Sequence, residues 1–259
     1  MKISVLTVCY NAETTIRQTL DSFCAQSHGE REMIVIDGAS SDNTVAIARN
    51  YASDCIRVVS EPDHGMYDAL NKGLRLYSGD AFGVLNADDA YHHSNVLAQV
   101  SEGLRHAAIV QGHLDFVADH ESKSIVRHWQ AKQRPVNGFK SGWMPAHPTF
   151  YVRREVANIV GEFDTALDCA ADYDWMLRAI DVFGFEVALL DSVLVDMKMG
   201  GKSTKDVPAQ IRHNLEALAV RQRWLDAGLV DYALLAKPLR KIGQFVLPAK
   251  QKMNGRKDV

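Results

Sequence analysis

The feature that most constrains the fold is an alternation of short apolar runs and helix-like segments in the first 60 residues. Residues 3–8, 33–37 and 56–60 are runs rich in Val and Ile, which is typical of buried strands. Residues 14–24 and 44–51 lie between these runs and are predicted helices, the first with apolar side chains at helical spacing. Two consecutive β-α-β units predict a parallel sheet with helices on both faces.

The remainder of the chain continues the mixture of strands and helices. Residues 81–85 form a further apolar run, and residues 64–73 are predicted to be a loop that runs into a short helix capped by Gly73. Downstream, the pattern predicts helices at 95–104, 172–182 and 209–225, and strands at 109–116, 124–129 and 186–195, the first two of them antiparallel to each other. No internal repeat or low-complexity linker interrupts the chain, so we expect one continuous domain followed by a basic C-terminal extension.

Composition narrows the classes of protein to consider. A net charge of -3 on 259 residues gives no reason to expect nucleic acid as a partner. The four cysteines show no C-x-x-C spacing, which favours reduced thiols in a reducing compartment over disulfides or a zinc site. The apolar run at residues 3–8 is too short for a signal peptide, and no stretch approaches the roughly 20 apolar residues that span a bilayer. We therefore expect a cytoplasmic protein.

Acidic residues follow two of the predicted strands. Asp88 and Asp89 come after the run at 81–85, and adjacent carboxylates are costly unless a cation or hydrogen bonds compensate them. Oxygen ligands of this kind suit Mg²⁺ or Mn²⁺ shared with a diphosphate. Asp37 ends the strand at 33–37, where an acid commonly accepts hydrogen bonds from a ribose or a base. The alternatives are a polar turn at Asp88 and Asp89, and a turn residue bonded to its own backbone at Asp37.

The glycine-rich signatures that cradle phosphates are missing. There is no G-x-x-x-x-G-K-[ST] motif, and no G-x-G-x-x-G motif follows the first strand. If a nucleotide binds, its diphosphate must therefore be neutralised mainly by a metal ion.

Four segments occur together in an order that resembles a known family. They are Thr7-Val8-Cys9-Tyr10-Asn11, Val35-Ile36-Asp37-Gly38-Ala39-Ser40-Ser41-Asp42-Asn43-Thr44, Asp68-Ala69-Leu70-Asn71-Lys72-Gly73 and Leu85-Asn86-Ala87-Asp88-Asp89. Together they resemble the family 2 glycosyltransferases of the GT-A fold, especially bacterial enzymes that build exopolysaccharide or lipopolysaccharide of the colanic-acid type. The resemblance covers about residues 1–205.

The resemblance implies an α/β fold with one Rossmann-like domain. Its central sheet is expected to be mixed and mostly parallel, with helices on both faces. The domain would span residues 1–205, with a nucleotide-sugar half at about 1–105 and an acceptor half at about 106–205. Residues 206–259 would form a helical, basic C-terminal extension.

The same resemblance assigns donor-side roles to residues that match the family motifs. Asp88 and Asp89 match the metal and diphosphate motif, with Asp89 favoured as the direct ligand of Mn²⁺ or Mg²⁺. The first position of this Asp-x-Asp pattern is Asn86, a poorer ligand, so the site depends on the two aspartates. The nucleotide-sugar side of the site is assigned to Thr7, Cys9, Tyr10, Asp37, Asp68, Asn71 and Asp88.

Asp172 matches the aspartate with which the family deprotonates its acceptor. It lies in Cys169-Ala170-Ala171-Asp172-Tyr173-Asp174, where the family often has Glu in the place of Ala171. A carboxylate at a helix N-terminus is held in its charged form by the helix dipole and by free N–H groups, which suits a general base. The alternative is a plain helix cap at Asp172.

Three further features bear on the acceptor and on the reaction. His147 lies in a segment that similar enzymes place beside the acceptor, although isolated histidines are often structural. Residues 199–203 form either a loop that closes on the diphosphate through Lys202 or a simple surface turn. Val220 replaces the Gln of the Gln-x-x-Arg-Trp motif of processive relatives, which favours transfer of a single sugar.

The resemblance therefore implies inverting transfer of one sugar from a nucleoside-diphosphate sugar, with UDP as our first choice, to a saccharide or lipid-linked saccharide in cell-surface polysaccharide biosynthesis. The basic, apolar tail at 232–259 suggests peripheral contact with the inner face of the membrane, and its alternatives are a solvated tail or a contact between subunits of a homo-oligomer. Two other functions stay open. A nucleotidyltransferase would normally carry a glycine-rich basic loop after the first strand, and this loop is absent. A non-catalytic nucleotide-sugar-binding subunit would not require the four acids Asp37, Asp88, Asp89 and Asp172 together.

Overall fold

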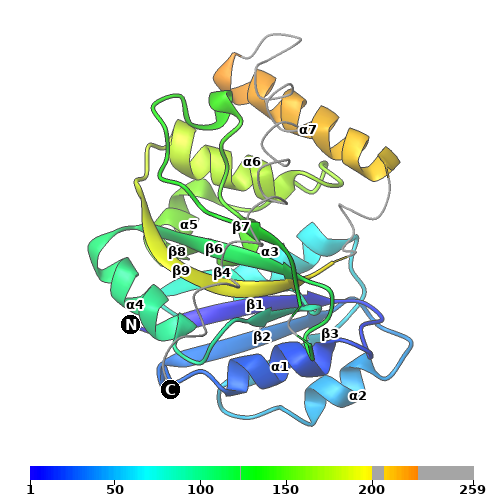
Figure 1. Ribbon diagram of the computed structural model, residues 1–259. Helices are drawn as coiled ribbons and strands as arrows, with labels where there is room; N and C mark the ends of the chain where they lie inside the picture. The colour runs from blue at the N-terminus through cyan, green and yellow to red at the C-terminus, as the bar shows by residue number, and fades with distance from the viewer. Residues whose placement is uncertain (123, 200–206, 227–259) are drawn as a thin grey trace.

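A computed structural model describes residues 1–122, 124–199 and 207–226 (Figure 1). Its single sheet has the strand order β3-β2-β1-β4-β8-β6-β9-β5, and β7 pairs with β6. The strands are β1 Ile3–Cys9, β2 Arg31–Asp37, β3 Ile56–Ser60, β4 Ala81–Val84, β5 Asp89–Tyr91, β6 Ile109–Val117, β7 Ile125–Trp129, β8 Tyr151–Arg153 and β9 Val187–Lys198. The predicted α/β fold with a mixed, mostly parallel sheet is confirmed.

Four parallel strands, β3, β2, β1 and β4, form the first half of the sheet. The side chains of β1 are buried along its whole length, because helices cover both faces of this part of the sheet. The register pairs Cys9 with Asp37 and Asp37 with Ser60, so the strands end together at one edge. This edge is where the β-α-β pattern predicts a ligand.

The second half of the sheet is mixed. β6 pairs antiparallel with β7, as predicted, and parallel with β9. Two short strands were not predicted: β8, which joins β4 to β6, and β5, which lies antiparallel to β9. Runs of three residues carry too little periodic pattern to be recognised in a sequence.

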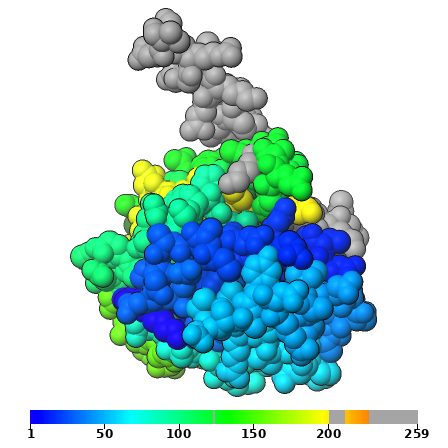
Figure 2. Space-filling model, turned by 90° about the horizontal axis from the view of Figure 1, so that it is seen from below, coloured from blue at the N-terminus to red at the C-terminus, as the bar shows by residue number. Residues whose placement is uncertain are grey.

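The helices form two layers, one on each face of the sheet (Figure 1). Their bounds are α1 Ile16–Cys24, α2 Thr44–Arg49, α3 Met66–Leu76, α4 Val96–His106, α5 Arg154–Val160, α6 Ala171–Leu177 and α7 Val207–Leu225, with short turns at Gly138–Ser141 and His147–Thr149 and a π-helical turn at Arg178–Val182. Apolar residues of α1, α2 and α4 pack on one face, and those of α3, α5 and α6 pack on the other. Seen from below, the surface is built mainly from the N-terminal residues, which include α1 and α2 (Figure 2).

The predicted end of the third helix at Gly73 is wrong. The helix α3 continues to Leu76, and Gly73 is buried against the sheet. A Cβ atom at this position would lie 3.0 Å from Ile36 Cδ1 and 3.1 Å from Leu6 Cδ1. The glycine is therefore required by close packing between helix and strand, and not by a left-handed turn.

The helix α7 lies against α6, although the sequence placed it in a separate extension (Figure 1). Ala217 and Val220 are buried in the same apolar cluster as α6. Trp224 Nε1 donates a hydrogen bond of 2.8 Å to Asp174 Oδ1. The division of the chain at residue 205 stays a prediction, and residues 227–259 lie outside the described residues.

Candidate active site

Asp37 lies at the carboxyl end of β2 and is completely buried. Its Oδ2 accepts hydrogen bonds from the Ser40 amide, at 3.0 Å, and from Ser60 Oγ, at 2.8 Å. Its Oδ1 accepts from Ser40 Oγ at 2.5 Å. The bond from the Ser40 amide is the turn contact that the sequence offered as an alternative, and the bond from Ser60 also joins this loop to the end of β3. A direct contact with a nucleotide stays a prediction.

The end of β1 presents three residues assigned to the nucleotide, in different environments. Thr7 is buried, and its Oγ1 has no hydrogen-bond partner in the described part of the chain. Burial and the neighbouring charge of Asp37 raise the pKa of the Cys9 thiol, so Cys9 is a neutral wall residue. Tyr10 is 66% exposed and is therefore available to contact a base or ribose.

Asp88 and Asp89 follow β4 at the same edge of the sheet. Asp88 is half-buried, whereas Asp89 is completely buried at the start of β5. Asn86 Nδ2 donates a hydrogen bond of 2.9 Å to Asp89 Oδ2. Asp89 Oδ1 has no partner among the described residues. Burial and the adjacent Asp88 charge raise the pKa of Asp89 well above its ordinary value, and burial also raises the pKa of Asp88.

This pair of acids fits a divalent cation. A buried carboxylate oxygen without a partner is costly, and a cation would remove that cost and restore the charged form. Of the two carboxylates, that of Asp88 is the more accessible, and the Asn86 side-chain amide orients that of Asp89 by donating a hydrogen bond to it. Among the described residues, no third His, Cys, Asp or Glu side chain joins these two acids in a metal-binding group, as expected if a diphosphate completes the coordination.

The first turns of α3 carry Asp68 and Asn71. Asp68 Oδ2 accepts a hydrogen bond of 3.0 Å from the His64 amide, which closes the loop before the helix. Asn71 is buried, and its side-chain amide forms hydrogen bonds of 3.0 and 2.8 Å with the backbone carbonyl and amide of Phe163. Asn71 therefore fastens α3 to the loop before α6. Its direct contact with the donor stays a prediction.

Asp172 lies in the first turn of α6, and Ala170, not Asp172, is the residue that precedes the helix. The Tyr67 hydroxyl donates a hydrogen bond of 3.1 Å to Asp172 Oδ1, and the Tyr173 amide donates one of 2.8 Å to the same oxygen. Asp172 Oδ2 makes no hydrogen bond within the described residues, and His147 Nδ1 lies 3.9 Å from it. The Asp172 side chain is 21% exposed. One carboxylate oxygen is thus held in place while the other stays available.

Tyr67 is a site residue that the sequence did not reveal. It immediately precedes Asp68, the first residue of the third family motif, but a single aromatic residue on a helix is usually part of the core. Burial and the Asp172 charge raise the pKa of Tyr67, so its phenol stays protonated and donates. A pocket of about 110 Å³ opens beside it, between the start of α3 and residues 165–168. Ligand pockets typically measure about 300–1,000 Å³, so this pocket can hold only part of a donor or acceptor.

Two predicted features fall outside the described residues: Lys202 with most of its loop, and the basic tail at 232–259. Within the part of the chain that the structure describes, no helix is long and apolar enough to cross a membrane.

Comparison with known proteins assigns the chain to a family. The model of glycosyl transferase family 2 matches residues 4–161, which include β1 to β4 and the acids at their ends. The chain belongs to this family.

Relatives of this family 2 glycosyltransferase are found in mycobacteria. An uncharacterized glycosyltransferase of Mycobacterium tuberculosis is 30% identical over 219 residues, covering 83% of this chain and 82% of its own. A PGL/p-HBAD biosynthesis glycosyltransferase of Mycobacterium bovis is 25% identical over 188 residues, or 68% of each chain.

Two solved structures share the fold. S. aureus TarS residues 1–349, in complex with UDP-GlcNAc, superimposes with a TM-score of 0.67 at 18% identity, covering 95% of this chain and 73% of that one. The mannosyltransferase PcManGT of Pyrobaculum calidifontis, in complex with GDP-Man and Mn²⁺, gives a TM-score of 0.64 at 19% identity, covering 91% and 68%. The fold is therefore GT-A-like, and membership of family 2 makes the chain a glycosyltransferase.

Proposed function

We propose that this glycosyltransferase transfers a single sugar from a UDP-sugar to an acceptor hydroxyl, inverting the anomeric configuration, with Asp172 as the general base. The geometry of Asp172 supports this proposal most strongly. Its Oδ1 is fixed by Tyr67 and by a backbone amide, while its Oδ2 has no hydrogen-bond donor among the described residues. A general base needs this combination of a fixed position and a free oxygen.

In the proposed reaction, the acceptor oxygen attacks the anomeric carbon on the face opposite the diphosphate. A new C–O bond forms, the bond to the diphosphate breaks, and Asp172 Oδ2 takes the proton of the acceptor hydroxyl. One displacement of this kind inverts the configuration. His147, which lies half-buried beside Asp172, is proposed to line the acceptor side of the site.

On the donor side, Asp88 and Asp89 are proposed to hold Mn²⁺ or Mg²⁺ with the diphosphate, Asp88 through its accessible carboxylate. A cation held there would stabilise the negative charge of the leaving diphosphate electrostatically. Tyr10, with its exposed ring at the end of β1, is proposed to contact the nucleoside. Asp37, Asp68 and Asn71 are proposed to shape the pocket through the hydrogen bonds that position its loops. Thr7 and Cys9 are proposed to shape it through their place at the end of β1.

The acceptor is proposed to be a saccharide on a lipid carrier, in the synthesis of a cell-surface polysaccharide. Basic residues beside apolar ones at 232–259 support contact with an anionic membrane, since each Lys or Arg near such a surface contributes about 1 kcal/mol. The corresponding location of the enzyme is the cytoplasm, at the inner face of the membrane. Sedimentation with anionic vesicles, comparing the full chain with one ending at Asp231, tests the tail. Equal binding by both would exclude its role.

The reaction is tested by supplying UDP-sugars and GDP-sugars with Mn²⁺ and measuring the release of free nucleoside diphosphate. We expect release with a UDP-sugar, its loss with a chelator, and an inverted product by NMR when an acceptor is present. Release of nucleoside diphosphate from a GDP-sugar but not from a UDP-sugar would overturn the choice of a uridine nucleotide as donor. If the donor binds tightly but no donor is consumed with any acceptor, the chain is a binding subunit and not an enzyme.

A further inference from the structure

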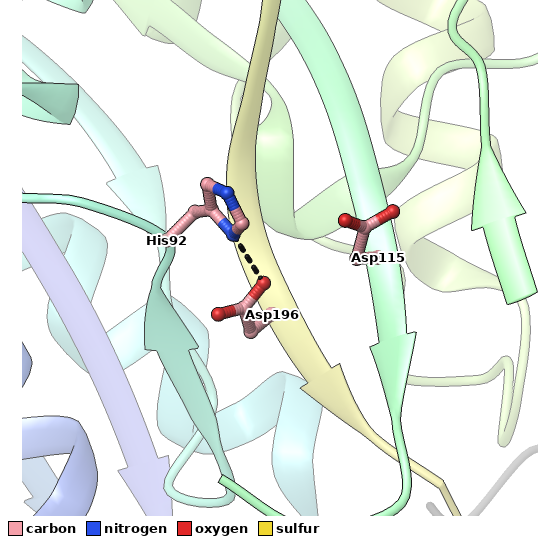
Figure 3. Close-up of side chains that lie close together, drawn as sticks. All are labelled: His92, Asp115 and Asp196. Atoms are coloured by element: carbon pink, nitrogen blue, oxygen red, sulfur yellow. Dashed lines mark hydrogen bonds and ion pairs between the residues drawn. The ribbon is translucent and has the colours of Figure 1, made fainter. Parts of the chain in front are cut away.

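A second group of titratable side chains lies away from Asp88 and Asp89, on the second half of the sheet. Asp196 of β9 and Asp115 of β6 are register partners, and His128 of β7 is the partner of Asp115 on its other side. His92 follows β5, which lies on the other side of β9 from β6, and its ring lies beside Asp196 (Figure 3). Four neighbouring strands thus bring two acids and two histidines together.

The contacts within this group are short. His92 Nδ1 lies 2.6 Å from Asp196 Oδ1, and His128 Nδ1 lies 2.5 Å from Asp115 Oδ1. One ligand atom from each of His92, Asp115 and Asp196 can be chosen so that all three lie within 4.8 Å of one another. No other set of three or more His, Cys, Asp or Glu residues in the described part of the chain has this arrangement.

The two carboxylates need compensation. Asp115 and Asp196 are only 3% and 2% exposed, and neighbouring buried acids repel each other. Within the described residues, their ion pairs are with His128 and His92, and neither acid pairs with a lysine or arginine. Neutral histidines leave two negative charges in the protein interior, so the group has the charge to attract a divalent cation.

This group is separate from the proposed diphosphate site. On the β5–β9 pair, Asp89 lies opposite Met197, whereas Asp196 lies opposite Ala90. Successive residues of a strand point to opposite faces, so Asp89 and Asp196 project to opposite sides of the sheet. Leu114 and Phe116, which flank Asp115, pack in the layer of α1 and α4, so Asp115 faces the layer of α3 and α6.

We propose that His92, Asp115 and Asp196 bind a divalent transition-metal ion of the Zn²⁺ class, independently of the donor diphosphate. One imidazole nitrogen with two carboxylates suits Zn²⁺, whereas Mg²⁺ prefers oxygen ligands throughout. Zn²⁺ is usually tetrahedral, so bonds of about 2.0–2.2 Å place its ligand atoms roughly 3.3–3.6 Å apart. Any ligand atoms of this group that lie near the 4.8 Å limit must therefore approach each other by about an ångström when the ion binds.

Binding replaces the proton that His92 Nδ1 shares with Asp196, and that proton leaves to solvent or moves to Nε2. The His92 side chain is 35% exposed, which leaves room for a water molecule as the fourth ligand. His128 orients Asp115, as outer-shell partners commonly do. The ion would join β5 to β6 through β9 and so brace the strand that begins with Asp89. This proposal goes beyond the proposed transfer reaction and does not depend on it.

The test is calorimetric titration of the metal-stripped full chain with Zn²⁺, without nucleotide, followed by Co²⁺ absorption spectra. We expect one equivalent to bind and Mg²⁺ not to compete. His92→Gln and Asp196→Asn should each weaken binding at least tenfold, and His128→Gln should weaken it less. His106→Gln, at an exposed histidine on α4, is the matched control and should leave affinity unchanged.

Asp88→Asn separates this site from the donor site. It should bind Zn²⁺ without nucleotide as the wild type does, even if it loses nucleotide-dependent Mn²⁺ binding. Circular dichroism of each variant without metal establishes that it is folded. The proposal is overturned if the folded wild type shows no saturable Zn²⁺ binding, or if Asp88→Asn abolishes binding while His92→Gln and Asp196→Asn preserve it.

Discussion

The hydroxyl of Tyr67 donates a hydrogen bond of 3.1 Å to Oδ1 of Asp172, which joins the first turn of α3 to the first turn of α6 across 105 residues of sequence. Helix α3 follows the loop at the carboxyl edge of the parallel strands, so this bond brings Asp172 to the edge where Asp37 and Asp88 lie. The hydrogen bond therefore links a helix assigned to the donor side with the proposed base.

Replacing Asp172 by Asn removes the proposed base and preserves its shape. We expect turnover to fall by at least ~10²-fold, the usual contribution of a general base. Donor affinity, measured by calorimetry with the UDP-sugar, should stay unchanged. Glu155→Gln, at an exposed acid in the first turn of α5, is the control and should retain activity. Near-normal turnover of Asp172→Asn would assign the base to another residue.

Tyr67→Phe deletes the hydrogen bond to Asp172 and keeps the aromatic packing. A hydrogen bond to a charged group contributes about 1.5–3 kcal/mol, so loss of this positioning should lower kcat by roughly tenfold or more. The donor KM should change little, because the hydroxyl is directed at Asp172. A raised donor KM with normal kcat would instead place Tyr67 in donor binding.

Asp89→Asn should stabilise the protein when no divalent cation is present. Burial and the charge of Asp88 raise the pKa of Asp89 in the folded state, so between its unfolded and folded pKa values the native protein holds the extra proton. The free energy of unfolding of the wild type then falls as pH rises through this range. We expect the Asp89→Asn substitution to stabilise the protein at pH 7, because it removes a buried charge beside Asp88, and to have less effect near pH 4, where the native acid holds its proton. Urea unfolding at both pH values measures the difference. A less stable variant at pH 7 would contradict it.

His147 should make the protein sensitive to mild acid. Burial lowers its pKa below 6.5, although the Asp172 charge opposes the change. Below pH 6.5 the unfolded chain gains a proton that the native state resists, so stability is lost as pH falls toward the lowered pKa. His147→Gln should show a smaller loss of unfolding free energy between pH 7 and pH 5 than the wild type. The exposed His106, replaced in the same way, should leave the slope unchanged.

Glu32 should contribute to stability at neutral pH. Burial raises its pKa, but hydrogen bonds from Lys2, Ser4 and Ser78 outweigh burial and bring the pKa to about 2. A depressed acid pKa stabilises the fold above the unfolded value, 4.5, and this contribution disappears as pH falls toward 2. Glu32→Gln should therefore cost roughly 1–2 kcal/mol at pH 7, after allowance for partial exposure. Glu30→Gln, at an exposed acid nearby, should cost less. Equal losses would refute the role of the buried network.

Local pattern was sufficient for much of the fold and part of the site. The apolar runs predicted β1, β2, β3 and the antiparallel pair β6–β7, and the edge where parallel strands end located Asp37, Asp88 and Asp89. The position of Asp172 in the first turn of a helix was also predicted. The detailed roles of Asp37 and Asn71 could not be predicted from the sequence. Each forms hydrogen bonds with residues that are distant in the chain and become neighbours only when it folds.

The sequence by itself determined the α/β class and the acids at the sheet edge, because strand and helix periodicity arise from short-range sterics and from burial of one face. The family was recognised separately, from the resemblance of four sequence motifs. Only the tertiary structure decided that Tyr67 meets Asp172, that Gly73 packs against β1 and β2, and that Asp115 lies beside Asp196. Each of these contacts joins segments far apart in the chain. Which distant segments pair depends on the free energy of the whole packed core, and no local window of sequence contains that quantity.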